Sequence, residues 1–533
     1  MDFKKILFNL KPQLSLGFIF LLSFGIFFYL QPEARLIDPD SFYHTKLTTI
    51  LRDWGILHEF PWTQSSLYRN IFTDYHLGYH LLLIPFLSIF HSDLLGIQVA
   101  TIFFASLTIT TVIWCLYRWR VPWWGIGALL LLTAEPLLFR LSLAKAPSIG
   151  VGAAILGYYL ITQRRITWLF WWSWFFVWLY GAWPLLLVMA IVFIAVDSLS
   201  TLKSKEFVYN SLFKIVFEKV KVWIKQVFDN KNKKLLGVVL LGCLAGLVIN
   251  PYFPTNIIYL KQLFTMALVA YHSFIGIGAE WYPPNVYFLL NGIAYLLIPW
   301  LLLTIISVAN IKKQTNVSES TWILVLIFIF YTLRARRQVE YLVPFFVLSS
   351  ALMWRDNWVL ISNIKNWKVF YGWLPDWIRK KWVMILVAVY LLVVIPWGMV
   401  GSVLSVRKDL QGGYGFNVLR NAAGWLKNNT PANSIVFQSD WGTFPLLWYD
   451  NTHNLYLTGV DQTFMYEYDH EKHKLWVEVT KGKNNNPYNI AHDVFNASYY
   501  LLEKKFPAAL VWINKDKRFK KVYQDSEVII FAL

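Results

Sequence analysis

Two carboxylates one residue apart are the first residues of this sequence whose types and spacing could do chemistry. Asp38 and Asp40 stand in IDPDSFYHTK (37–46), directly after a long apolar run. Carboxylates at i and i+2 can hold one divalent cation, Mg²⁺ or Mn²⁺, through oxygen ligands, and such a cation can neutralise a departing phosphate. His44 and Lys46 follow about one helical turn later, where they could bind that phosphate. The alternative is a solvated loop with acidic residues that have no special role.

Glu280 is a second candidate, as a metal ligand or catalytic carboxylate. It lies in SFIGIGAEWYPPN (273–285), among apolar and aromatic residues and before two prolines. A charge in such surroundings is costly unless a metal ion or an arginine partners it. The alternative is an acidic residue near lipid headgroups.

Basic residues in two further segments could bind an anionic substrate. Arg334 and Arg337 stand in RARRQVEY (334–341), and arginine forks suit a phosphate or a carboxylate. They could instead pair with Glu340 or with headgroups. Arg140 and Lys145 follow another apolar run; they could bind the same anion or extend to headgroups.

The C-terminal 130 residues offer fewer candidates. Asp440 and Trp441, in QSDWGTFPLLWYDNTH (438–453), could form a pair that binds an acceptor substrate, or could be an ordinary strand end. His76 and His80 have the i, i+4 spacing of a metal site, but no third ligand is evident in the sequence. Packing and hydrogen bonding are the more common roles of such histidines.

Apolar helices must position these residues. Of the 533 residues, 57% are hydrophobic and 15% are charged, against about 25% charged in soluble proteins. Apolar runs of the length that crosses a bilayer, about 17–25 residues, recur along the first 400 positions. We expect a polytopic α-helical membrane protein with about 11–13 transmembrane helices. The predicted spans are 14–30, 96–117, 122–140, 148–163, 166–181, 183–197, 236–252, 286–308, 320–333, 339–355 and 383–403.

The charge distribution predicts how the chain is oriented. The net charge of +18 fits basic cytoplasmic loops that face anionic lipid, so we expect no nucleic-acid partner. Residues 201–235 alone hold nine lysines against three acidic residues. We therefore place the N-terminus in the cytoplasm, with an uncleaved first helix, and a helix at 207–228 on the inner membrane surface.

The predicted outer segments hold the candidate residues, except Arg140, which ends the predicted span 122–140. They are the loops 31–95 and 251–285 of a transmembrane domain (1–403), short loops around 143–148 and at 334–338, and a small extracytoplasmic α/β domain (404–533). In the first loop, 78–91 is too short to span and is predicted as a helix at the outer surface. In the second domain we expect a linker at 411–416, a helix at 422–429, and strands at 434–438, 454–460, 508–514 and 521–533.

The order of the motifs resembles that in the catalytic subunit of oligosaccharyltransferase, within the C-superfamily (GT-C) of membrane glycosyltransferases. DSFYHTK (40–46) is similar to the family's D-P-Y-Y-H-L-R, which implies that Asp40 is a metal-binding aspartate. IGAEWYPP resembles T-I-x-E followed by proline, so Glu280 would contact metal and acceptor. RQVEYLV is similar to R-F-x-Y-Y-L-A, so Arg337 would contact the acceptor.

The sequence departs from this family at two places. The family's second acidic motif lies about seven residues after an arginine at the end of the third span, where this chain has Pro147 and Ser148; Asp38 could stand in for it. The family's W-W-D-Y-G is reduced to Ser-Asp-Trp-Gly (439–442), which puts the acceptor in doubt.

The resemblance implies an inverting glycosyltransferase on the outer face, in the plasma membrane of a prokaryote. Its donor would be a polyprenyl-(di)phosphate-linked sugar and its acceptor a protein. Three alternatives stay open: a lipid-linked sugar transferase that modifies a lipid or polysaccharide, a transporter or flippase of lipid-linked sugars, and a non-catalytic partner subunit.

Overall fold

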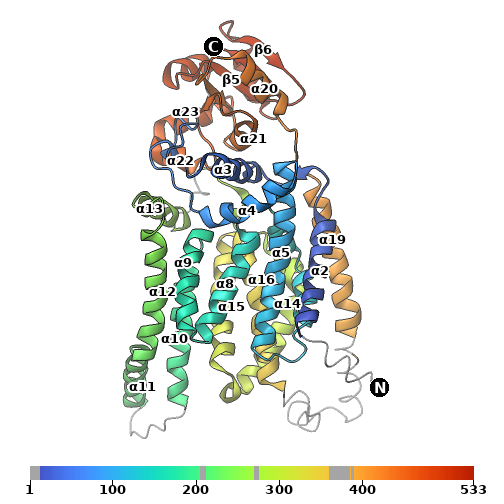
Figure 1. Cartoon of the computed structure of the whole chain (residues 1–533), viewed down its shortest axis with the longest axis vertical. Coiled ribbons are helices and arrows are strands. Elements are labelled where there is room, and N and C mark those ends of the chain that lie inside the picture. Colours follow the sequence, from blue (N-terminus) through green and yellow to red (C-terminus); the bar gives the residue numbers. More distant parts are fainter. Residues whose placement is uncertain (1–11, 204–211, 269–274, 359–384, 386–388) are drawn as a thin grey trace.

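Long helices build one end of the molecule and a smaller mixed α/β domain builds the other (Figure 1). The structure is a computed structural model that describes residues 12–203, 212–268, 275–358, 385 and 389–533. The main hydrophobic core runs from the helical part into the C-terminal domain, since Phe42 of the first part and Trp448 of the second both belong to it.

The helical part follows the apolar runs of the sequence. Its helices are α2 (Pro12–Leu30), α5 (Asp93–Arg118), α6 (Ile126–Leu132), α7 (Glu135–Leu141), α8 (Pro147–Thr162), α9 (Ile166–Leu179), α10 (Leu185–Lys203), α12 (Asn230–Val248), α14 (Val286–Ala309), α15 (Asn316–Arg334), α16 (Val339–Asp356), a π-helix (Tyr390–Val394) and α19 (Ile395–Leu410). In the described part of the chain, five segments are long and apolar enough to cross a membrane: α2, α5, α14, α15 and 390–410. Four more apolar helices, Leu77–Ile89, α8, α9 and the Leu185–Ser200 part of α10, are shorter.

One predicted span differs in kind from the structure. The expected continuous helix at 122–140 is two short helices, α6 and α7, which meet at Thr133 and Ala134. Pro136 lies in the first turn of α7, because proline lacks the N–H that a continuous helix needs and suits a helix start. The short α7 carries Arg140 in its last turn. The predicted span at 383–403 begins outside the described residues.

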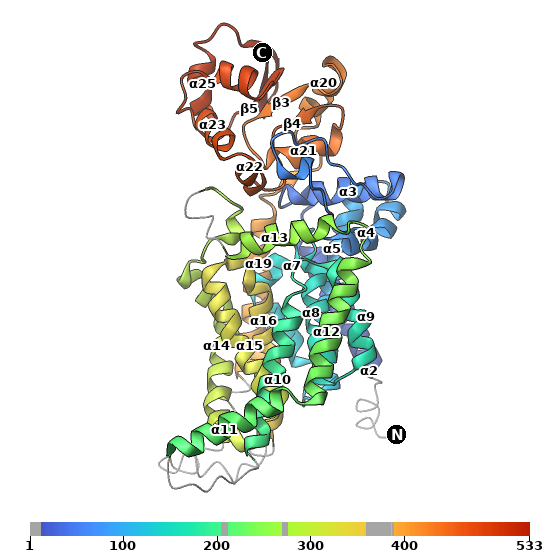
Figure 2. The same cartoon turned by 90° about the vertical axis from the view of Figure 1, so that its left-hand side faces the viewer.

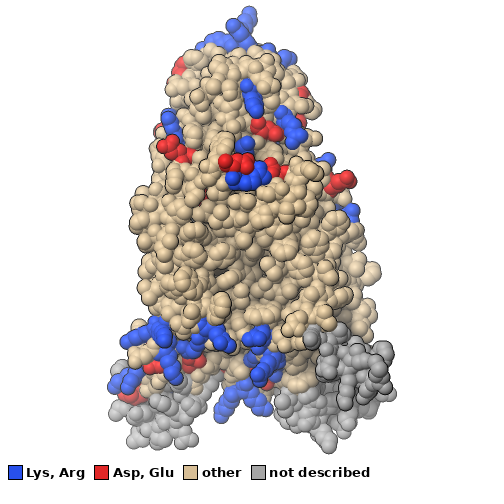
Figure 3. Space-filling view, in the orientation of Figure 1, with Lys and Arg blue, Asp and Glu red and all other residues tan. Residues whose placement is uncertain are grey.

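The charges divide the surface into layers (Figure 3). A broad band around the helices is almost free of charged side chains on the face shown, and Lys and Arg gather at the end away from the C-terminal domain. This band is the surface that a bilayer would cover. With the apolar helices, it identifies the chain as an integral membrane protein.

A layer of shorter elements lies between the bundle and the C-terminal domain (Figure 2). It contains α3 (Asp40–Trp54), η1 (Leu67–Arg69), α4 (Leu77–Ile89) and α13 (Thr255–Leu268). The helix predicted at 78–91 is α4. At the opposite end α11 (Leu212–Val227) crosses beside the bundle (Figure 2); the predicted residues 207–211 of this helix lie outside the described residues.

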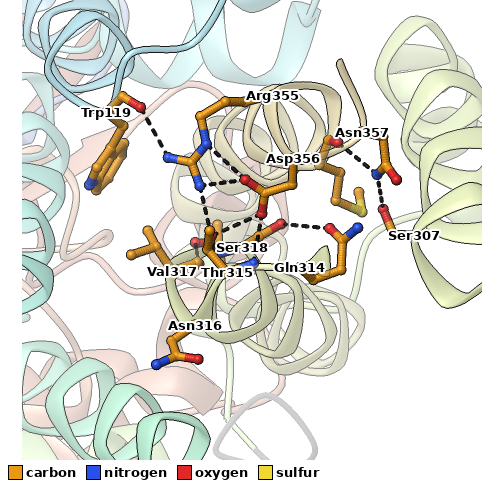
Figure 4. A network of polar contacts seen from close by, with 12 residues as sticks. Trp119, Ser307, Gln314, Thr315, Asn316, Val317, Ser318, Arg355, Asp356 and Asn357 are labelled. Atoms are coloured by element: carbon orange, nitrogen blue, oxygen red, sulfur yellow. Dashed lines mark hydrogen bonds and ion pairs between the residues drawn. The ribbon is translucent and has the colours of Figure 1, made fainter. Parts of the chain in front are cut away.

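Polar contacts tie α15 to α16 at that opposite end (Figure 4). The Asp356 carboxylate accepts hydrogen bonds from the Thr315 N–H (2.8 Å) and hydroxyl (2.9 Å). Arg355 pairs with Asp356 at 2.7 Å and donates to the Trp119 carbonyl at 3.0 Å. These bonds fix the base of a hairpin whose apex carries Arg337.

The C-terminal domain holds a five-stranded mixed sheet in the order β4-β3-β5-β7-β6. The strands are β3 (Ile435–Gln438), β4 (Leu455–Tyr456), β5 (Tyr499–Glu503), β6 (Lys520–Gln524) and β7 (Val528–Ala532). The helices are α20 (Arg420–Asn429), α21 (Thr443–Asp450), α22 (Thr463–Tyr468), α23 (His470–Thr480), α24 (Pro487–Asn489), the π-helix Ile490–Val494 and α25 (Pro507–Ile513). β3 pairs in parallel with β4 and β5, and β7 pairs antiparallel with β5 and β6.

The prediction for this domain is correct for some elements and wrong for others. The helix α20 and the strand β3 lie where the sequence pattern placed them. The single strand predicted at 521–533 is instead two antiparallel strands, β6 and β7. The predicted strand at 508–514 is instead the helix α25. A short apolar run cannot tell a strand from a buried helix, and here Pro507 at the helix start favours the helix.

A small antiparallel ribbon joins the first outer segment to the linker before the C-terminal domain. β1 (Arg35–Leu36) pairs with β2 (Tyr414–Gly415). Gly413 lies so close to β1 that a Cβ atom there would be 2.5 Å from the Leu36 carbonyl oxygen. This ribbon fixes the chain immediately before Asp38.

Candidate active site

Asp38 and Asp40 face a lysine from another segment. Asp40 is the first residue of α3, and an Asp38 carboxylate oxygen accepts a hydrogen bond from the Ser41 N–H at 3.2 Å. Lys145, between α7 and α8, has its Nζ 2.6 Å from Asp40 Oδ2 and 3.5 Å from Asp38 Oδ1. Three residues that the sequence marked separately are therefore in contact.

Burial shapes the charge of this trio. It raises the pKa of Asp38 to about 6, with Asp40 and Glu280 adding to the rise and Lys145 opposing it. Burial alone would lower the pKa of Lys145, but Asp38 and Asp40 raise it above its ordinary value. Lys145 is therefore a cation at neutral pH.

Glu280 is held by two arginines. One of its oxygens accepts from Arg337 at 2.9 Å and the other from Arg140 at 2.5 Å. Burial would raise the pKa of Glu280, but Arg337, Arg140 and Lys145 together hold it well below its usual range. Arg337 also lies over the Trp281 ring, 4.4 Å from its centroid.

A further carboxylate binds one of these arginines. Glu340, in the first turn of α16, accepts from Arg140 Nη2 at 2.7 Å and Nε at 3.0 Å. The Tyr180 hydroxyl donates to the other Glu340 oxygen at 2.9 Å. The sequence showed Glu340 only as a partner for the neighbouring arginines; its bond to Arg140, 200 residues away, depends on the fold.

The C-terminal domain contributes one more carboxylate near Asp40 and Glu280. Asp461, just before α22, accepts a hydrogen bond from the Thr463 N–H at 2.8 Å. Burial raises its pKa to about 6, and Asp40 and Glu280 add to the rise. The neighbouring Gln462 Nε2 would lie 3.2 Å from a Cβ on Gly276, in the Glu280 segment. Sequence reasoning missed Asp461; its one signal was an acidic residue directly after the apolar run 454–460.

His44 faces the interior of the outer layer. Its Nδ1 lies 2.8 Å from His80 Nε2, and His80 Nδ1 lies 2.7 Å from Asp74. Burial lowers the pKa of His44, and His80 and His76 lower it further, so the ring is neutral. The spacing of His76 and His80 therefore serves hydrogen bonding and ring contacts, as when His76 stacks on Tyr180.

Four predicted site residues lie apart from this cluster or face away from it. Lys46 has Asp450, Lys427, Asp93 and Asp53 as its charged neighbours. Arg334, the last residue of α15, is exposed. Asp440 pairs with Lys505 at 2.9 Å, and Trp441 packs against the second hydrophobic core of the C-terminal domain.

The predicted metal ligands do not form a metal site in this arrangement. Lys145 lies against both aspartates, and the two oxygens of Glu280 are bonded to arginines. Within the described ranges, no group of three or more His, Cys, Asp or Glu side chains is placed to hold a metal ion.

Comparisons with known proteins address the fold. The sequence matches no protein-family model and no curated protein sequence. The structure is similar to that of the archaeal oligosaccharyltransferase AglB from Archaeoglobus fulgidus in complex with an inhibitory peptide and a dolichol-phosphate. The TM-score is 0.61 at 12% identity, over 98% of this chain and 75% of that one. Another structure of the Archaeoglobus fulgidus enzyme is a complex with Zn and sulfate.

Two further membrane proteins share the architecture. ArnT from Cupriavidus metallidurans, bound to undecaprenyl phosphate, gives a TM-score of 0.53 at 12% identity over 97% of this chain and 98% of that one. The arabinofuranosyltransferase AftD from Mycobacteria gives 0.53 at 11% identity over 97% of this chain and 40% of the longer AftD chain. The resemblance seen in the sequence is thereby confirmed at the level of the fold: this chain has the fold of the GT-C membrane glycosyltransferases.

Proposed function

We propose that the protein is a membrane glycosyltransferase that transfers a sugar or oligosaccharide from a polyprenyl-phosphate- or polyprenyl-diphosphate-linked donor to an acceptor. One observation carries this proposal: on a GT-C fold, Asp38 and Asp40 face Lys145 while Glu280 faces Arg140 and Arg337. Carboxylates beside cations, at the bundle end next to a separate domain, suit an anionic lipid donor and a second substrate.

The proposed step needs one base and one stabilised leaving group. Asp40 or Asp38 accepts the proton of the acceptor, whose oxygen or nitrogen bonds to the anomeric carbon from the face opposite the phosphate, with inversion. The bond from the anomeric carbon to the phosphate oxygen breaks, and the lipid phosphate leaves with its electron pair. Lys145 offers that phosphate a positive charge, while Glu280, held by Arg337 and Arg140, positions the acceptor.

The sidedness follows from the charges. Lys and Arg gather at the end of the molecule away from the C-terminal domain (Figure 3), which is the pattern of cytoplasmic segments. The active site and the C-terminal domain then lie on the extracytoplasmic face, with the N-terminus in the cytoplasm. A prokaryotic plasma membrane fits a polyprenyl-linked donor.

Mg²⁺ or Mn²⁺ on Asp38, Asp40 and Glu280 would supply two positive charges where Lys145 supplies one. A similar fold has been solved with Zn and sulfate. In this chain, however, Lys145 lies against one oxygen of each aspartate, and both oxygens of Glu280 are bonded to arginines.

One structural observation and one chemical argument favour an acceptor other than a protein asparagine. Asp440 and Trp441, the predicted acceptor-binding pair, are engaged within the C-terminal domain, by Lys505 and by the second hydrophobic core respectively. A hydroxyl acceptor needs a single general base, whereas an asparagine amide is a much poorer nucleophile. A lipid or polysaccharide acceptor is therefore the second candidate, and replacing Trp441 should spare transfer to it.

Transfer by the purified chain tests the proposal. In lipid nanodiscs with a radiolabelled polyprenyl-phosphate sugar, we expect Asp40→Asn and Glu280→Gln each to reduce transfer at least 100-fold, as loss of a catalytic carboxylate does. Asp516→Asn is the matched control, because Asp516 is a carboxylate of the C-terminal domain that pairs with Arg518. Unchanged transfer in the Asp40→Asn, Glu280→Gln double variant would refute the assignment. Donor movement across the membrane without transfer would instead indicate a flippase, and absence of donor consumption a non-catalytic subunit.

A further inference from the structure

The position of Lys145 suggests which cation this site uses. A divalent ion of the Mg²⁺ type takes about six oxygen ligands, of which one or two are carboxylates that must be free to bind it. Here the Lys145 ammonium is 2.6 Å from Asp40 Oδ2 and 3.5 Å from Asp38 Oδ1, so a cation already lies against both aspartates. The third predicted ligand, Glu280, has both oxygens committed to arginines.

The backbone around Lys145 holds it in this place. The Lys145 N–H donates to the Leu143 carbonyl at 2.8 Å, and the Lys145 carbonyl accepts from the Ser148 hydroxyl at 2.9 Å and the Ser148 N–H at 3.2 Å. Thr108 of α5 in turn donates to the Ser148 carbonyl at 2.7 Å. The lysine is thus anchored from its own segment and from a neighbouring helix, and its side chain is only 15% exposed.

The same short segment has no acidic residue that could act as a metal ligand. Pro147 and Ser148 begin α8, and neither can contribute a carboxylate. Asp38 and Asp40 therefore share the buried Lys145 ammonium as their cationic partner. Removing the ammonium would leave two adjacent carboxylates with an uncompensated charge.

We infer that Lys145 takes the place of a divalent cation in this protein: its ammonium holds Asp38 and Asp40 together and presents the positive charge to the donor phosphate, so that the site works without Mg²⁺ or Mn²⁺. The part of this inference that concerns the donor phosphate depends on the proposed function. The part that concerns the aspartates and the ammonium does not.

Binding of Mn²⁺ alone tests the substitution. Titrations of the purified full chain at pH 7.5, followed by electron paramagnetic resonance, compare wild type, Lys145→Ala, Lys145→Ala with Asp40→Asn, and Lys521→Ala. Lys521 is an exposed lysine in β6 and serves as the control. We expect no saturable site in wild type or Lys521→Ala, one site in Lys145→Ala, and its loss in the double variant. A saturable site in wild type that is absent from the Lys145→Ala, Asp40→Asn double variant would overturn the inference, as would a folded Lys145→Ala protein that binds no Mn²⁺.

A chelator experiment addresses the donor. With a fluorescent polyprenyl phosphate as probe, we expect the Kd of wild type to change less than twofold on addition of EDTA, and Lys145→Ala to bind at least tenfold more weakly. A loss of tenfold or more with EDTA, reversed by Mn²⁺, would overturn the inference. If no variant binds the lipid phosphate while the Mn²⁺ results are as expected, the proposed function fails and the role of Lys145 at the aspartates stands. Thermal unfolding of each variant confirms that it is folded.

Discussion

At the scale of single residues, charge pairing was partly visible in the sequence. The sequence indicates Asp38 and Asp40 by their spacing, Lys145, Arg140 and Arg337 as cations that suit an anionic substrate, and Glu280 because a charge in apolar surroundings needs a partner. The structure brings them into two adjacent groups. The ion-pair partner of each residue could not be predicted from the sequence, because partners such as Arg140 and Glu340 are brought together only by the fold.

A histidine beside this site carries a pH dependence that can be measured. His473 of α23 is buried and its Nε2 lies 3.0 Å from the Gln462 side chain, next to Asp461. Burial lowers the pKa of His473 to about 4. Between pH 6.5 and 4 the unfolded chain therefore binds more protons at this residue than the folded chain, so His473 makes the protein less stable as pH falls through that window.

Comparison with His473→Gln isolates this effect. Asp38 and Asp461, whose pKa values are raised to about 6, act with the opposite sign below pH 6, so the informative quantity is the difference between variants. We expect the wild-type Tm to fall by about 1–2 °C more than that of His473→Gln between pH 7 and 5, because the unfolding entropy of a chain this long is large. The control is His492→Gln, because His492 is exposed. Parallel Tm curves for wild type and His473→Gln would contradict the assignment.

At the scale of elements, apolar runs predicted helices well and their interruptions poorly. Continuous runs such as α5 and α14 were found directly, because length and composition suffice to identify them. The break between α6 and α7 and the helical state of α25 were missed. In both cases a proline and a few neighbouring residues determine the secondary structure of a short apolar stretch. Periodicity alone does not predict that structure.

The hairpin of α15 and α16 links a remote network to the site. Arg337 and Glu340 stand at its apex, while Asp356 binds the Thr315 backbone and hydroxyl at its base (Figure 4). The Asp356 side chain is only 3% exposed. Its contact is with Thr315, the N-cap residue of α15, whose side chain accepts from the Ser318 N–H.

Asp356→Ala should therefore destabilise the protein by about 1–2 kcal/mol, because the Thr315 N–H loses its acceptor and Arg355 its partner. Thermal or denaturant unfolding in detergent measures the change. The matched control is Asp229→Ala: Asp229 precedes α12 but its side chain makes no capping hydrogen bond. Equal stability of the two variants would show that the network does not hold the hairpin.

At the scale of the whole molecule, three distant parts of the chain build one site. The bundle supplies Arg140 and Glu340, the outer layer supplies Asp40, and the C-terminal domain supplies Asp461. The ribbon of β1 and β2 couples the last two, since it joins the chain before Asp38 to the linker of the C-terminal domain. A substitution in this ribbon should therefore change the positions of the site residues without altering any of their side chains.

Two glycines in that linker allow an effect on the ribbon to be distinguished from a general effect of substitution in the linker. A Cβ on Gly413 would lie 2.5 Å from the Leu36 carbonyl oxygen, whereas a Cβ on Gly415 would meet nothing within 4 Å. We expect Gly413→Ala to force the ribbon apart, at a cost of about 1–3 kcal/mol, and to lower transfer at least tenfold because Asp38 and Asp40 follow β1 directly. Gly415→Ala should keep wild-type transfer and wild-type resistance of the linker to protease. If Gly413→Ala also kept both, the ribbon would not position the two aspartates, and their placement would have to come from α3 and Lys145 alone.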